Sequence, residues 1–166
     1  HIGWSYFLRN PDGHSDFDPS QQYAQAVAID PNNPYAHAYW GHLLAWRSSV
    51  GVTDVREHFN AALRSGRDRE RVRDMQLIAN YNQGESGTPE FLRTVVEMKS
   101  NGEAIPEKYN HTIEGMFENA CGAYGAELLR NIKANISGDD LTTIYRDIGS
   151  KAMEQNDRTA CFAKLK

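Results

Sequence analysis

The chain has 166 residues, a formal net charge of −4 at pH 7 and a sequence pI of about 5.9. This length suits one compact domain or about five short repeats, and the acidic balance does not favour nucleic acid, whose phosphates attract clustered Lys and Arg. No segment approaches the roughly 18 consecutive apolar residues that a membrane-spanning helix needs, so we expect no membrane span.

The first 30 residues predict a short helical hairpin. The run Ile2-Gly3-Trp4-Ser5-Tyr6 places a glycine among apolar and aromatic residues in a pattern that returns later in the chain. A loop over 10–14 then leads to a second helix with Tyr23 and Ala26 on one face. Because residues three or four apart share a helix face, both helices have an apolar side on which to pack.

The clearest helix start in the sequence is at Asn33. The turn Asp30-Pro31-Asn32-Asn33 precedes it, and the side-chain oxygen of Asn33 can accept a hydrogen bond from the new helix. Pro34 then lacks an N–H that would be unsatisfied at the first helical position. The face expected to pack inward carries His37, Trp40, Gly41 and Leu44.

A second helix is expected from about Thr53, because Val55, Phe59 and Ala62 recur at helical spacing. It forms a hairpin with the helix that starts at Asn33. Gly41 lies where a large side chain would hold the partner helix away.

The remaining sequence predicts three more hairpins. Helices over 69–81 and 88–99 form the third, and helices over 106–121 and 124–136 form the fourth. The last contains Gly149, which lies 34 residues after Gly115, and ends in a helix with Cys161 and Leu165. Four glycines are expected at helix–helix contacts within hairpins: Gly3, Gly41, Gly115 and Gly149.

The junction from Ala26 to Leu44 resembles that between two tetratricopeptide repeats, helix–turn–helix units of about 34 residues. The resemblance implies an all-α fold, a right-handed superhelix of antiparallel helical hairpins. The approximate repeats of this single domain are 1–30, 31–66, 67–102, 103–138 and 139–166.

The chain has no initiator Met and ends within a pattern, so we expect a fragment of a longer protein. Between 64 and 136 the periodicity also fits another helical bundle.

The resemblance implies a non-catalytic module that binds a peptide or protein segment in its concave groove. Tyr35, His42 and Trp46 form a stripe nearly opposite the Gly41 face, and large aromatic side chains with a polar edge are typical anchors of interfaces. The other candidate partner-binding residues are Trp4, Phe7 and Arg71. These aromatic side chains fit equally well as packing against neighbouring helices.

The arginine-rich run over 64–74 has five arginines and three acids. Alternating charges on a helix start are typical of a solvated face with local ion pairs. In the alternative interpretation, Arg67 or Arg71 binds carboxylates of a partner.

No metal, cofactor or catalytic arrangement is evident in the sequence. His37 and His42 point in different directions on a helix, and His111 with Glu114 lacks a third ligand, so a helical enzyme using that pair is the weakest hypothesis. Cys121 and Cys161 are too few and too far apart for a disulfide framework, and both are expected as packing residues.

The alternative function is a regulatory or homodimerising segment of a larger protein. The sequence leaves the cellular compartment undefined.

Overall fold

The computed structural model describes residues 2–9, 18–47 and 52–166, excluding the side chains of Ile2, Tyr6, Phe7 and Val52. The loops expected over 10–14 and around Gly51 lie outside these ranges. Every regular element in the described part is helical, which confirms the all-α class. The chain divides into two compact units, His1–Gly87 and Thr88–Lys166. Their boundary falls between the two helices expected for the repeat at 67–102.

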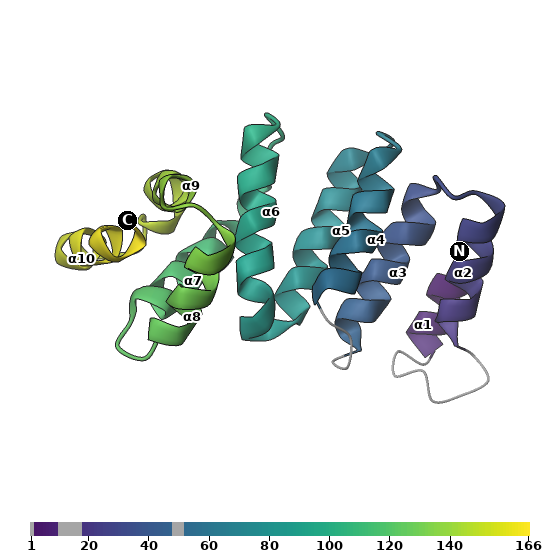
Figure 1. Cartoon of the computed structure of the whole chain (residues 1–166), viewed down its shortest axis with the longest axis horizontal. Coiled ribbons are helices and arrows are strands. Elements are labelled where there is room, and N and C mark those ends of the chain that lie inside the picture. Colours follow the sequence, from purple (N-terminus) through teal and green to yellow (C-terminus); the bar gives the residue numbers. More distant parts are fainter. Residues whose placement is uncertain (1, 10–17, 48–51) are drawn as a thin grey trace. The chain divides into compact units, whose positions relative to one another are not determined.

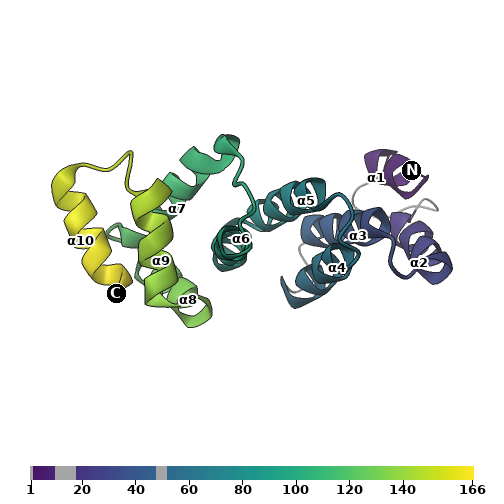
Figure 2. The same cartoon turned by 90° about the horizontal axis from the view of Figure 1, so that it is seen from above.

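The first unit contains α1 (Ile2–Arg9), α2 (Pro19–Ile29), α3 (Pro34–Trp46), α4 (Val52–Arg64), α5 (Arg69–Asn82) and the short turn η1 (Gly84–Gly87). Helices α2 to α5 lie side by side in both views (Figures 1 and 2), and α3 contacts α2, α4 and α5. Helix α1 packs on α2. Consecutive helices therefore pack as neighbours, as expected for hairpins joined by short turns.

The starts of α2 and α3 follow from local chemistry. The Asn33 side chain accepts a hydrogen bond from the backbone N–H of Ala36 at 3.0 Å, and Pro34 is the first residue of α3. Asp18 caps α2 in the same way through Ser20 and also pairs with Arg47, at 2.8 Å, beyond the end of α3. Although burial opposes it, the hydrogen bonds from Arg47 and Ser20 lower the pKa of Asp18. Side-chain caps thus fix the starts of both α2 and α3.

The core of the first unit lies mainly between α3, α4 and α5. Phe59 and Val55 of α4 are buried there with Val72 and Ala79 of α5. Across the α3–α4 contact, Trp40 stacks on His58 with ring centroids 4.4 Å apart. His37 lies within hydrogen-bonding distance of the Pro31 carbonyl through Nε2, at 3.0 Å, and of His58 through Nδ1, at 3.3 Å. His37 is therefore a buried packing residue, as its position in the sequence suggested.

The second unit contains α6 (Thr88–Ser100), η2 (Glu107–Tyr109), α7 (Asn110–Cys121), α8 (Ala126–Asn135), α9 (Gly138–Ile144), the π-helical turn η3 (Tyr145–Gly149) and α10 (Gln155–Leu165). Helix α7 contacts α8, η3 and α10, whereas α6 contacts α8 and α9. Phe117 of α7 packs edge to face on Tyr145, with centroids 5.3 Å apart. Helix α7 is therefore the central packing element of this unit.

Three of the four predicted glycines lie at helix contacts. A Cβ at Gly3 would meet the Tyr23 ring, one at Gly41 the Phe59 ring, and one at Gly149 the Phe117 ring. Gly149 packs on α7, however, and not on the partner helix expected within its own hairpin. The prediction for Gly115 is wrong, because a Cβ there would have no neighbour within 4 Å. The spacing of 34 residues placed Gly115 on α7, but on a side of that helix where nothing packs closely against it.

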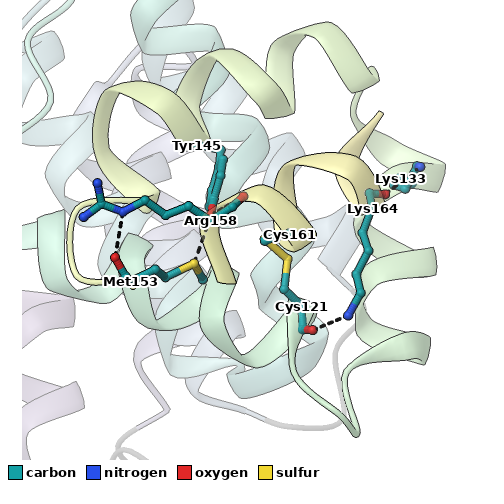
Figure 3. The surroundings of a disulfide bond; sticks show 7 residues. All are labelled: Cys121, Lys133, Tyr145, Met153, Arg158, Cys161 and Lys164. Atoms are coloured by element: carbon teal, nitrogen blue, oxygen red, sulfur yellow. Dashed lines mark hydrogen bonds between the residues drawn. A yellow bond between two sulfur atoms is a disulfide. The ribbon is translucent and has the colours of Figure 1, made fainter. Parts of the chain in front are cut away.

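The prediction that Cys121 and Cys161 are separate packing residues is also wrong, because they form a disulfide (Figure 3). Cys161 is buried as expected, but its sulfur joins α10 to the last residue of α7. Beside it, the Lys164 ammonium donates a hydrogen bond to the Cys121 carbonyl at 2.6 Å. A separation of 40 residues in sequence gave no indication that the two helices would meet.

Candidate protein-binding groove

A cavity of about 630 Å³ opens in the first unit, with residues from α1, α2, α3 and α5 in its lining. This volume lies within the range of about 300–1,000 Å³ that is usual for ligand pockets. Helix α2 supplies one wall through Gln22, Gln25 and Ile29. Ile29 is 86% exposed, which is unusual for so large an apolar side chain. We call this cavity the groove.

Two tyrosines form the apolar side of the groove. Tyr23 of α2 is only 5% exposed and stacks with Tyr39 of α3, their ring centroids 6.4 Å apart. On its other side Tyr39 meets Trp4 of α1, at 5.0 Å. Gly3 allows this packing, because a Cβ there would lie 2.5 Å from the Tyr23 ring. The aromatic cluster thus joins three helices, and its two tyrosines line the groove.

Arg71 provides the charge in the groove. It is the only ionised side chain at neutral pH in the described lining, and it extends from α5. Its Nη2 donates to the Tyr39 hydroxyl at 3.1 Å, and its guanidinium lies 5.8 Å from the centre of the Tyr35 ring. The Tyr35 hydroxyl in turn donates to Asp68 at 2.8 Å. These contacts hold the exposed Arg71 beside the apolar side of the groove.

The hydroxyl of Tyr23 is a buried polar group without a hydrogen-bond partner among the described residues. Burial is the main cause that raises the pKa of this phenol, and the nearby Tyr39 raises it further. Leaving a buried hydroxyl unpaired costs about 1–3 kcal/mol. The Tyr23 residue lines the groove, whereas its hydroxyl oxygen is buried from solvent.

The structure separates the predicted partner-binding residues. Tyr35 and Arg71 line the groove, whereas His42, Trp46 and Trp4 are not in its described lining. Trp4 is half-buried and packs on His42 edge to face, with centroids 6.0 Å apart. Burial lowers the pKa of His42. Trp46 is 48% exposed at the end of α3. The side chain of Phe7 lies outside the described part.

Sequence reasoning missed Tyr23 and Tyr39 as groove residues. Tyr39 follows Tyr35 by four residues, so both share a face of α3, and this spacing was a usable signal. The sequence pattern places Tyr23 only at a helix contact within the first hairpin. Its place in the groove depends on the approach of α1, which a single helix pattern does not reveal.

The remaining candidate residues lie outside the groove lining. His111 and Glu114 lie 2.9 Å apart, with the His111 side chain almost fully exposed. No group of three potential metal ligands occurs within the residues that the structure describes. In the arginine-rich run, Arg67 donates to the Asn32 carbonyl at 3.1 Å, and Arg73 is buried and hydrogen-bonded to Gln76. The run is therefore only partly a solvated face.

No helix in the described ranges has the length and apolar character needed to cross a membrane. Comparison with protein-family models, with curated proteins and with solved structures gives no match to this chain.

Proposed function

We propose that the first unit is a non-catalytic interaction module that binds an extended segment of another protein in the groove. The observation that carries the proposal is the combination of Tyr23, Tyr39 and Arg71 around one cavity. Tyr and Arg are enriched among residues that contribute most to binding, because they bury large areas and form directional polar contacts.

The same proposal includes the tetratricopeptide-like arrangement of the hairpins as a right-handed superhelix. It is supported by the contacts of α3, which packs on its hairpin partner α4 and also on α5, the first helix expected for the next repeat. Stacked hairpins of this kind leave an extended surface formed by their first helices. Arg71 and Tyr39 come from two such first helices.

Peptide selection on the full chain tests this function. The immobilised protein is exposed to a displayed library of random 12-residue peptides, and enriched peptides are synthesised for fluorescence anisotropy. The variant Ala26→Trp places a large ring in the groove lining, and Ala28→Trp places the same ring on an exposed position of α2 outside it. We expect Ala26→Trp to weaken binding at least tenfold and Ala28→Trp to leave it unchanged.

Three outcomes contradict the proposal. The library yields no peptide above background, or the two variants bind equally, or the groove is occupied by a second copy of the chain. In the third case sedimentation detects a dimer that Ala26→Trp dissociates and Ala28→Trp does not. That result supports the alternative, a segment that assembles with itself.

A further inference from the structure

We propose that the groove selects segments in which an aspartate or glutamate side chain stands beside an apolar residue. The inference rests on the proposed function and names the class of partner. The acid would pair with Arg71, and the apolar side chain would cover the rings of Tyr23 and Tyr39.

The charge of Arg71 favours an acidic ligand. Arg71 forms no ion pair within the described residues, and its hydrogen bond there goes to the neutral Tyr39 hydroxyl. The nearby Asp68 is not in the described lining, and its carboxylate accepts a hydrogen bond from the Tyr35 hydroxyl. An Arg guanidinium has five N–H donors in a planar fork. With Nη2 engaged, the other donors remain for a carboxylate of the ligand.

The amides of Gln22 and Gln25 on α2 are a second feature of the lining, independent of the charge. They can both donate to and accept from a peptide backbone. The groove therefore offers partners for a main chain as well as for an acid.

The acid is assigned to a side chain and not to a free C-terminus. Arg71 is the only cation in the described lining. A single guanidinium suits a side-chain carboxylate, whose main chain continues in both directions along the groove.

The test uses the selected 12-residue peptides, synthesised with an amidated C-terminus. Each is compared with a copy in which its acidic residue is replaced by the matching amide, Glu by Gln or Asp by Asn. We expect this replacement to weaken binding to the wild-type chain about tenfold or more. In Arg71→Gln the acid and amide peptides should bind equally. The control Arg64→Gln removes an exposed arginine outside the groove lining and should keep the difference.

Tyr23→Phe keeps the ring and removes the hydroxyl. We expect it to leave the binding of both peptides unchanged, because the hydroxyl is buried and the ring is kept. Circular dichroism of each variant checks that the fold is retained.

Failure of this inference differs from failure of the proposed function. Neutral peptides that bind in an Ala26-dependent way would overturn the acidic preference and keep the binding module. Peptides that bind only with a free terminal carboxylate would overturn the assignment to a side chain. Binding that is insensitive to both Arg71→Gln and Ala26→Trp would overturn both proposals.

Discussion

The Phe59 ring of α4 occupies the space that a side chain at Gly41 of α3 would need. A Cβ built at Gly41 would lie 2.9 Å from this ring and 3.3 Å from the Cβ of His58. Carbon atoms normally keep about 3.5–4.0 Å apart, so no side chain fits without movement of the Phe59 ring or of one helix. The close approach of α3 and α4 therefore requires glycine at this position.

Gly41→Leu should lower the free energy of unfolding of the first unit by about 2 kcal/mol or more. Overpacking typically costs about 1–3 kcal/mol and outweighs a gain of roughly 1 kcal/mol in helix propensity. All three tryptophans, Trp4, Trp40 and Trp46, belong to the first unit, so urea unfolding followed by tryptophan fluorescence reports on it directly.

Gly115→Ala is the matched control for a helical glycine. Its Cβ would meet no neighbour within 4 Å, so the substitution should raise stability by up to about 1 kcal/mol. Circular dichroism follows this change, since α7 belongs to the second unit. A Gly41→Leu protein as stable as the wild type would refute the packing role of Gly41.

The sequence was sufficient to predict helices and their starts, because those depend on neighbouring residues. The capping of α3 by Asn33 and the small residue at Gly41 are examples, and both lie in segments with a regular apolar pattern. The groove and the disulfide depend on which distant helices meet. Tyr23 needs α1 and α3 to form its site, and Cys121 needs α10. Neither contact has a local signature.

Loss of the Cys121–Cys161 disulfide should destabilise the second unit by about 2–4 kcal/mol. Cross-linking residues 40 positions apart restricts the unfolded chain, and native disulfides typically contribute this much. The double variant Cys121→Ser, Cys161→Ser is melted beside the wild type by circular dichroism, with and without dithiothreitol. The reductant should lower the melting temperature of the wild type alone.

Tryptophan fluorescence provides the internal control for this experiment, because the second unit contains no tryptophan. The fluorescence transition should stay the same in the double variant. An unchanged circular dichroism transition after reduction would mean that the disulfide contributes little, and that hydrogen bonds such as Lys164 to the Cys121 carbonyl hold α10 in place.

The first unit should lose stability as pH falls below about 6.5. Burial lowers the pKa of His42. Burial is also the main cause that lowers the pKa of His58; the nearby His37 ring lowers it further, and the charge of Asp54 partly opposes both effects. The folded state then binds fewer protons than the unfolded state, whose histidines titrate near 6.5. The contribution of the two histidines to the free energy of unfolding is fully present above that pH. It decreases as the pH falls, until the pH is below their pKa values in the folded state.

Fluorescence melts at pH 7.5 and 5.5 measure this effect, with the double variant His42→Gln, His58→Gln as control. The variant should show a smaller drop between the two pH values than the wild type. An equal drop in both proteins would place the acid sensitivity on other groups.

Trp46→Ala separates a long bound segment from a short one. Trp46 lies 11 residues after Tyr35, about 16 Å along the axis of α3, and outside the groove lining. A 12-residue extended peptide, about 40 Å long, can span both positions. We predict that Trp46→Ala weakens its binding about 30-fold, since an interface aromatic can contribute about 2 kcal/mol. A peptide truncated to the groove should bind the variant as well as the wild type.

Because Trp46 is 48% exposed, the melting temperature should change little. A lower melting temperature with unchanged affinity for the long peptide would instead make Trp46 a structural residue of α3.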